Sequence, residues 1–427
     1  MDLPLVPIPT PITENDFTLH LLFHIILSLL TYLSVRPLCP TLLIMFLLHL
    51  CLPFILLDHT ERLPSLLGYK IVCNHSTHSS NTCFPRSFAL AHTLLLANVA
   101  AVQEPRSFSQ ANQHDEWRKA MQLELHELEL NQTWDLTTLP KGKKAIGSRW
   151  IYKLKLLLDG KIDRYKARLV TKGYTQIEGI DYFDSFSPIA KTVTVRLFLA
   201  ITSSHSWPIS QLDVNNAFLH GHLNEEVYMH PPEGYLQAQS GQVCCLKRSL
   251  YGLKQASRQW NKEFSSKLKA YSFRQSQHAY CLFHRQTSTS FRALLVYVDD
   301  VLITGTSLDC IQDVKAYLDN LFTIKDLGFA RYFLGLELAR SSHCTYVMQC
   351  KYLRDILVDC KMHDAHSVPT PLSLGIRFDS TTGALLPSPD RYRRLIGHML
   401  YLGFSRSNIS FAVQQFKQFL QHPQEPH

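Results

Sequence analysis

The stretch FRALLVYVDDVLITG, residues 291–305, sets two adjacent acids between two apolar runs. Residues 294–298 precede Asp299 and Asp300, and residues 301–303 follow them. Two short runs rich in β-branched residues around a polar pair are typical of a β-hairpin, so we expect both acids at the bend. Because Asp favours turns by bonding its own backbone, a plain turn without any catalytic role also explains the pair.

A third acid lies in WPISQLDVNNAFLHG, residues 207–221, where Asp213 stands inside an apolar, strand-like run. Side-by-side carboxylates repel one another unless a cation lies between them. Three carboxylates at strand ends offer the hard oxygen ligands of a site for two magnesium ions, with positions left for water and phosphate oxygens. Together with a basic hairpin upstream, described next, the three acids favour nucleotidyl transfer on a nucleic acid, although each acid alone is explained by local structure.

A basic stretch lies between Lys141 and Lys172, with eleven Lys and Arg residues and only two acids. Apolar residues alternate with the cations on both sides of Asp159 and Gly160, which predicts a β-hairpin with Asp-Gly at its turn. Such a strip of cations suits contact with phosphates. The alternative is an ordinary solvated hairpin face.

The whole composition is that of a globular protein. The 427 residues carry 43 Lys and Arg against 35 Asp and Glu, a net charge of +8, with 46% apolar and 18% charged residues. These values exclude a disordered tail, a collagen and a small disulfide-rich protein. The 11 cysteines form no C-x-x-C pair, so neither a disulfide framework nor a zinc site is indicated, and a reducing compartment is expected.

Residues 17–57 are apolar apart from Arg36 and divide into two stretches, 17–35 and 37–57, each long enough to cross a bilayer. Two membrane spans and a Pro/Ser-rich linker translated out of frame explain this leader equally well. Residues 61–115 are expected to be a connector. From Glu116 a helix is expected, with Trp117, Met121, Leu125 and Leu128 on one face and the acids on the other.

Collinear motifs carry a resemblance that covers some 300 residues. They are RYKARLVTKGYTQIEGIDYFDSFSPIAK (164–191), QLDVNNAFLHGHLNEEVYM (211–229), SLYGLKQASRQW (249–260), LLVYVDDVLITG (294–305), IKDLGFARYFLGLELAR (324–340) and YRRLIGHMLYL (392–402). The chain resembles the reverse transcriptase of copia-type LTR retrotransposons. This resemblance implies an α+β right-hand polymerase with fingers, an antiparallel palm sheet and a thumb, after a poorly structured or helical apolar leader.

The resemblance also implies domain bounds. Residues 1–60 would be the apolar leader and 61–115 the connector. Residues 116–350 would form fingers and palm, and residues 351–427 a thumb or connection that stops before any ribonuclease H domain.

Roles follow for residues that match the family motifs. The catalytic and metal-binding acids would be Asp213, Asp299 and Asp300, which would hold two Mg²⁺ ions, with Mn²⁺ as a substitute. The nucleotide-binding residues would be Lys166, Arg168, Phe218, Tyr251, Gly252 and Lys254. Leu334 and Gly335 would grip the primer. Phe218 would exclude a 2′-hydroxyl, and Lys166 and Arg168 would share one strand face because side chains alternate. His220 and His222 are expected at the surface with no metal role.

The implied partners are an RNA template, a DNA primer and deoxynucleotides, and the implied location is a cytoplasmic retroelement particle. Two other functions stay open. One is an inactive element fragment that at most binds nucleic acid, and the other is a polymerase-like remnant anchored in a membrane through residues 17–57. The sequence indicates no oligomeric state.

Overall fold

The structure of the chain is a computed structural model that describes residues 69–70, 104–157, 161–341, 344–362, 364–366, 378–379 and 383–427. The predicted apolar leader at 17–57 and the predicted Asp159-Gly160 turn lie outside these residues. Among the helices in the described ranges, none combines the length and the apolar character that crossing a bilayer requires.

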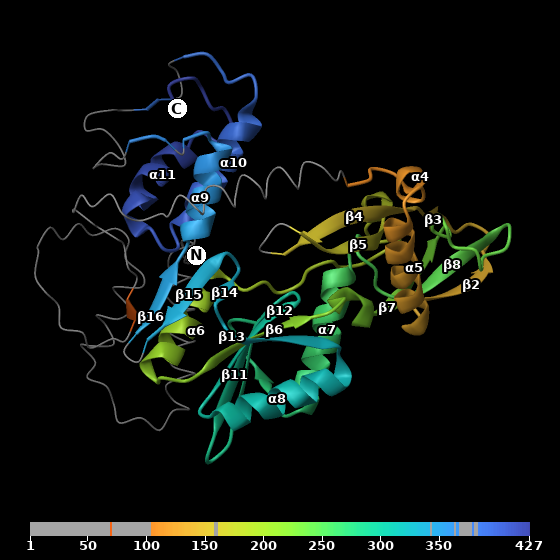
Figure 1. Cartoon of the computed structure of the whole chain (residues 1–427), viewed down its shortest axis with the longest axis horizontal. Helices are drawn as coiled ribbons and strands as arrows, with labels where there is room; N and C mark the ends of the chain where they lie inside the picture. The colour runs from red at the N-terminus through yellow and green to blue at the C-terminus, as the bar shows by residue number, and fades with distance from the viewer. Residues whose placement is uncertain are drawn as a thin grey trace, which may run out of the picture.

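A six-stranded antiparallel sheet forms the centre of the molecule (Figure 1). Its order is β13-β6-β12-β11-β10-β9. The strands are β6 (Ile209–Val214), β9 (Arg274–Gln275), β10 (Leu282–Gln286), β11 (Phe291–Tyr297), β12 (Asp300–Gly305) and β13 (Ile324–Phe329). Both faces are covered, which is why β11 and β12 are almost continuously apolar rather than alternating.

Helices α7 (Ala256–Ala270) and α8 (Leu308–Leu321) cover one face of this sheet, and α6 (Thr192–Ser204) covers the other. Leu294 packs in the cluster that contains Phe264 of α7, whereas its neighbour Leu295 packs in the cluster that contains Phe198 of α6. The alternation of side chains along β11 therefore joins two cores through one strand.

A second lobe holds the basic hairpin. Strands β4 (Ser148–Leu156) and β5 (Ile162–Thr171) pair antiparallel, as predicted. Helices α4 (Phe108–Ala111) and α5 (Asp115–Leu130) pack with this hairpin. A four-stranded sheet, ordered β2-β8-β7-β3, completes the lobe from β2 (Trp134–Thr138), β3 (Ala145–Ile146), β7 (His222–Met229) and β8 (Gln242–Arg248). Short 3-10 helices are η1 (Gly173–Thr175) and η2 (Ala217–His220).

The predicted apolar face of α5 is largely confirmed. Trp117, Met121 and Leu128 are buried, whereas Leu125 is only half-buried. The prediction that the acids lie on the opposite face is wrong for Glu124, which is buried on the face that packs against β5. Its carboxylate faces a backbone N–H of β5, a partner that helical periodicity does not reveal.

The C-terminal part begins at a small sheet ordered β1-β16-β15-β14. Its strands are β1 (Tyr69–Lys70), β14 (Tyr332–Phe333), β15 (Leu336–Arg340) and β16 (Thr345–Met348). Helices α9 (Cys350–Asp359), α10 (Pro389–Leu402) and α11 (Ser410–Lys417) follow, with η3 (Ser407–Ile409) before α11. Figure 1 shows these helices and the hairpin lobe on opposite sides of the molecule, with the central sheet below and between them.

Candidate functional site

The register of the central sheet brings the predicted acids together. Asp213 of β6 lies directly opposite Asp300 of β12. Directly opposed residues on antiparallel strands have Cβ atoms about 4.5–5.5 Å apart. Asp299 occupies the turn just before β12, and its carbonyl accepts a hydrogen bond of 2.9 Å from the N–H of Val214, the residue after Asp213. Three acids that are distant in sequence therefore share one edge of the sheet.

The turn that carries Asp299 is held in an unusual backbone conformation. Val298 has a φ of 56°, a left-handed value that is costly for a β-branched residue. The indole N–H of the buried Trp260 donates a 2.7 Å hydrogen bond to the Val298 carbonyl. Helix α7 thus holds the tip of the hairpin and, with it, the two acids that follow Val298.

Burial and repulsion between carboxylates disfavour the charged forms of two of these acids, Asp299 and Asp300. Burial raises the pKa of Asp299, and the charge of Asp213 raises it further, against partial compensation from its own N–H, Arg168 and Lys166. Burial also raises the pKa of Asp300, together with the charges of Asp299 and Asp213. Gln211 opposes this rise by donating a 3.3 Å hydrogen bond to Asp300 Oδ1. An added cation would relieve the repulsion.

Two predicted nucleotide-binding cations stand near the acids. Lys166 and Arg168 are both half-buried on one face of β5, as predicted from the strand period. The guanidinium of Arg168 lies 4.7 Å from the ring centre of Tyr251, and the ring of Phe218 meets the same tyrosine at 5.1 Å. Arg168 Nε is buried and has no acceptor among the residues that the structure describes. A buried donor of this kind suits a bound anion or water.

The loop from Tyr251 to Lys254 is fastened to the end of β5. The N–H of Thr171 donates to the Tyr251 carbonyl at 2.8 Å, and the N–H of Lys254 donates to Gln176 Oε1 at 3.0 Å. Gly252 has a φ of 93°, and a Cβ there would lie 2.2 Å from the Thr171 carbonyl oxygen. The chain's own packing therefore requires this glycine, whereas Lys254 is exposed beside it.

The predicted primer-grip residues form the two-residue turn between β14 and β15. Leu334 and Gly335 have φ values of 51° and 78°. Both line a cavity of about 570 Å³ that Asp300 and Gln211 also line. The structure therefore joins this turn to the acidic edge of the central sheet through one cavity.

Three features of the site were not predicted. Glu124 and Glu104 each accept a hydrogen bond from an outward N–H of the hairpin, at Leu169 (3.3 Å) and Leu154 (3.0 Å) respectively. The prediction that His220 lies at the surface is wrong, because its half-buried ring packs 5.9 Å from Trp260 and 5.2 Å from Phe322. His222 is exposed, as expected.

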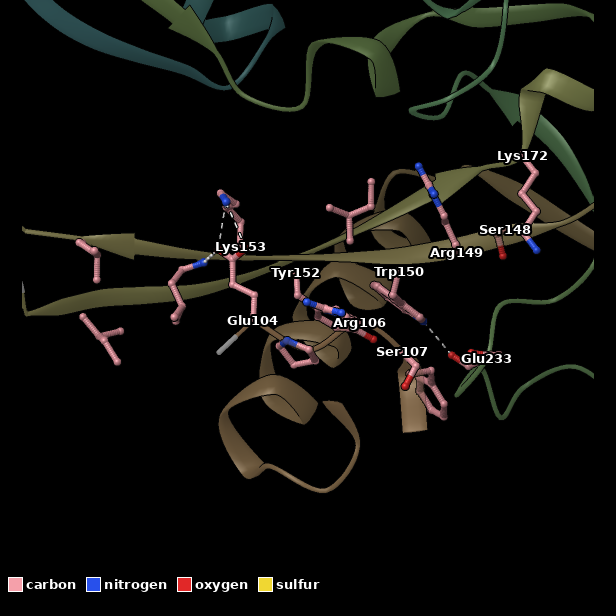
Figure 2. Close-up of a pocket in the computed structure, with 16 residues that line it drawn as sticks. Glu104, Arg106, Ser107, Ser148, Arg149, Trp150, Tyr152, Lys153, Lys172 and Glu233 are labelled. Carbon is pink, nitrogen blue, oxygen red and sulfur yellow. Dashed lines mark hydrogen bonds and ion pairs between the residues drawn. The ribbon is translucent and has the colours of Figure 1, made fainter. Parts of the chain in front are cut away.

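The third feature is a cavity of about 1090 Å³ along the outer edge of β4 (Figure 2). Arg106, Arg149, Lys153 and Lys172 line it together with Glu104 and Glu233. Lys153 is paired with Glu104, and Trp150 donates to the Glu233 carbonyl at 3.0 Å. The cavity therefore has more cationic than anionic side chains.

Residues 131–374 match the sequence family described as reverse transcriptase (RNA-dependent DNA polymerase). The chain belongs to this reverse transcriptase family. The Retrovirus-related Pol polyprotein from transposon RE1 of Arabidopsis thaliana is 40% identical over 335 residues, which are 78% of this chain and 23% of that protein. The corresponding polyprotein from transposon TNT 1-94 of Nicotiana tabacum is 38% identical over 341 residues, 76% of this chain and 26% of that protein.

These relatives confirm the predicted resemblance to copia-type retrotransposon polyproteins. The chain spans about a quarter of the length of the curated relatives, as 23% and 26% coverage show. Among solved structures, a foamy viral protease-reverse transcriptase in complex with double-stranded DNA aligns with a TM-score of 0.33 and 11% identity, over 73% of this chain and 49% of that one.

The acidic edge of this reverse transcriptase chain suits a divalent metal by its chemistry. Asp213, Asp299 and Asp300 supply only hard carboxylate oxygens, the ligand type that Mg²⁺ prefers. Their mutual repulsion raises the pKa of Asp299 and of Asp300, on top of the effect of burial. Within the described ranges, no three His, Cys, Asp or Glu side chains already stand at metal-binding separations.

Proposed function

We propose that the chain is an RNA-directed DNA polymerase module that adds deoxynucleotides to the 3′-hydroxyl of a primer paired with an RNA template. The observation that carries this proposal is the register of β6 and β12, which sets Asp213 opposite Asp300 with Asp299 at the adjoining turn. Membership of the reverse transcriptase family supports it.

Asp213, Asp299 and Asp300 would hold two Mg²⁺ ions, or Mn²⁺ in their place. When bound, the ions lower the pKa of the primer hydroxyl and neutralise the leaving pyrophosphate. The reaction forms a bond between the primer O3′ and the α-phosphorus and breaks the bond to pyrophosphate, and the hydroxyl proton passes to solvent. The acids of the chain thus fix the geometry of an in-line displacement.

The remaining predicted residues bind and orient the substrates. Lys166 and Arg168 would hold the triphosphate, and the ring of Phe218 would lie under the sugar and exclude a 2′-hydroxyl. The loop of Tyr251, Gly252 and Lys254 would line the nucleotide pocket. The Leu334-Gly335 turn would hold the primer end. Support for these roles comes from the contacts that join Arg168, Phe218 and Tyr251 and from the cavity that joins Asp300 to the turn.

The same proposal includes an architecture and a location. Residues 116–350 would form fingers and palm, with the β4–β5 hairpin in the fingers and the central sheet as the palm. Residues 351–427 would form the thumb or connection. The chain would work on an RNA template and a DNA primer in a cytoplasmic retroelement particle, as the relation to retrotransposon polyproteins suggests.

Primer extension tests this proposal. The full chain is incubated with poly(A), oligo(dT), Mg²⁺ and dTTP, beside Asp299→Asn and the control Asp319→Asn, which changes the charge equally at an exposed site on α8. We expect extension by the wild type and the control, and a loss on the order of a hundredfold or more in Asp299→Asn. Folded wild-type protein without extension, or full activity in Asp299→Asn, refutes the proposal.

The cationic hairpin supports a second candidate, a protein that binds nucleic acid without extending it. Arg149, Lys153, Lys155, Arg164, Lys166 and Arg168 share one face of β4 and β5 by cross-strand register. Binding to poly(A)·oligo(dT) that weakens with salt, without Mg²⁺-dependent extension, would favour this candidate.

A further inference from the structure

Glu124 is a buried acid in a helix that ends one residue before the segment matched to the reverse transcriptase family. It is 8% exposed on the face of α5 that packs against β5. Its Oε1 accepts a 3.3 Å hydrogen bond from the N–H of Leu169, a residue that is fully buried. Buried backbone donors need such a partner, since an unpaired buried N–H destabilises the folded state.

This hydrogen bond holds β5 next to one of the proposed triphosphate-binding cations. Leu169 directly follows Arg168, and Lys166 lies on the same strand face as Arg168. Glu124 and Lys166 both line a third cavity, also of about 570 Å³, along the free edge of β5. Glu124 therefore contacts the strand that carries the two cations.

The electrostatic surroundings couple Glu124 to the same cations. Burial raises the pKa of Glu124 to about 7, and Glu127 raises it while Leu169 N–H, Arg168 and Lys166 lower it. The charged or titratable groups that face it or share its cavity are Glu127, Arg164, Tyr165, Lys166, Arg168, His220 and Tyr251. Among the ion pairs of the described residues, none joins Glu124 to Lys166 or Arg168, and their charges act on its pKa through space.

The other side of the cavity is formed by the turn after the catalytic strand. Asn215 and Asn216 follow Asp213 and Val214 and line the cavity with Glu124. Asn216 donates a 2.9 Å hydrogen bond to Glu127, one helical turn after Glu124. Helix α5 therefore contacts both the strand that carries the cations and the turn beside the catalytic acid.

We propose that Glu124 is a positioning residue for the nucleotide triphosphate: its carboxylate fixes β5 at Arg168 through the Leu169 N–H, and its charge limits how strongly Lys166 and Arg168 attract phosphate. The proposal rests on the proposed function, because it assigns the triphosphate to those two cations.

The hydrogen bond of Glu124 strengthens triphosphate binding, whereas its negative charge weakens it. Two variants separate these contributions. Glu124→Gln keeps an acceptor for Leu169 but removes the charge, so the cations bind a triphosphate more tightly wherever wild-type Glu124 is ionised. Glu124→Ala removes the acceptor as well, so β5 loosens beside Arg168 and the triphosphate binds more weakly. Glutamine resembles protonated glutamate, so the first effect disappears at acidic pH.

Equilibrium binding of a fluorescent dTTP derivative to the full chain with poly(A)·oligo(dT) tests the proposal, in calcium so that no extension occurs. We expect the dissociation constant of Glu124→Gln to equal that of wild type at pH 6.0 and to be about fivefold lower at pH 8.5. Dividing the dissociation constant of the variant by that of wild type at the same pH cancels the effect of the nucleotide's own titration. Glu124→Ala should bind several-fold more weakly at both pH values.

Glu116→Gln is the matched control, because it removes the same charge from an exposed position on the same helix. The proposal is overturned if the dissociation constant of Glu124→Gln, divided by that of wild type, is the same at both pH values. It is also overturned if Glu116→Gln shows the same change in this ratio. If Glu124→Ala does not fold, the pH dependence of Glu124→Gln still tests whether the charge of Glu124 acts on the two cations. Wild type that binds nucleotide but never extends a primer refutes the proposed function alone, whereas absence of any nucleotide binding refutes both.

Discussion

Asp300 illustrates how a single side chain can weaken the fold that contains it. Its folded pKa is raised by burial and by Asp299 and Asp213, so the charged form is disfavoured in the folded state. As pH rises above the unfolded value near 3.9, ionisation therefore lowers the free energy of unfolding. The acidic edge is maintained at a cost in stability, a common feature of functional sites.

We expect Asp300→Asn to raise the thermal midpoint of the metal-free chain by roughly 2 °C at pH 7.5 and to leave it unchanged near pH 3.5. Asparagine retains the oxygen that accepts from Gln211, so the hydrogen bond at this position persists. Added Mg²⁺ should stabilise wild type and close the gap, because a ligand that binds only the folded state stabilises it. Thermal melts monitored by circular dichroism check this. Equal stabilisation by the exposed Asp319→Asn, or a less stable Asp300→Asn, contradicts the prediction.

The sequence alone indicates three of the acids of the site but not the fourth, Glu124. Asp213, Asp299 and Asp300 stand out in the sequence because apolar strand runs surround them, and the sheet register then brings them together. Glu124 carries no such signal, since one acid among several on an amphipathic helix is indistinguishable from a solvated one. Its burial depends on an N–H of β5 that is 45 residues away in sequence.

At the scale of elements, the β4–β5 hairpin is a two-stranded ribbon with different faces. Trp150, Tyr152 and Leu169 are buried on the face that packs with α5, and the opposite face carries the cations. Both outer edges are protected by glutamates, Glu104 beside β4 and Glu124 beside β5. Blocking edge N–H groups in this way prevents unwanted strand pairing.

The hairpin itself was predictable, because cations and apolar residues alternate with the strand period. Its supporting elements were not. Residues 104–111 lie in a segment that the sequence predicts to be a connector, yet Glu104 contacts β4 and Ala111 is fully buried in the hairpin core. These contacts join residues about 50 positions apart, which local composition does not report.

Arg149 tests whether the cationic face of the hairpin binds nucleic acid. It is exposed, stands on the cationic face and lines the cavity at the β4 edge (Figure 2). We expect Arg149→Ala to weaken binding to poly(A)·oligo(dT) and to reduce the slope of log affinity against log salt by about one. Fluorescence anisotropy at several salt concentrations measures both quantities.

Lys262→Ala is the control for Arg149→Ala, because it removes one exposed cation from α7, away from the hairpin. The slope should stay unchanged in this control. An unaltered slope in Arg149→Ala would show that the cationic face is only a solvated surface, the alternative that the sequence left open.

At the scale of the whole molecule, the segment after α10 contacts the central part through polar and apolar groups. Arg196 of α6 donates to the carbonyls of Gly403 and Phe404, at 3.2 and 2.7 Å, and Phe404 packs in the core cluster that contains Phe198 of α6. The placement of the C-terminal helices depends on contacts across as many as 208 residues of sequence, which no local pattern specifies.

A hydrogen bond from α10 reaches the turn of the proposed primer grip. The hydroxyl of Tyr401 in α10 donates a hydrogen bond to the Leu334 carbonyl, and burial raises the pKa of Tyr401 to about 12, so the hydroxyl stays a donor at neutral pH. A Cβ on Gly335 would lie 3.6 Å from the Tyr401 ring. The C-terminal helices therefore hold the turn that lines the cavity with Asp300.

We expect Tyr401→Phe to weaken primer–template binding about threefold to tenfold while the KM for dTTP stays within twofold of wild type. The lost hydrogen bond holds the turn of the proposed primer grip and not the proposed nucleotide pocket. Primer–template titrations and dTTP titrations of the extension rate separate the two effects. Tyr392→Phe is the matched control, since its hydroxyl donates a 2.7 Å bond to the Phe416 carbonyl within the C-terminal helices. An effect of the same size in that control, or a rise in the KM for dTTP alone, would show that Tyr401 serves general folding and not the primer turn.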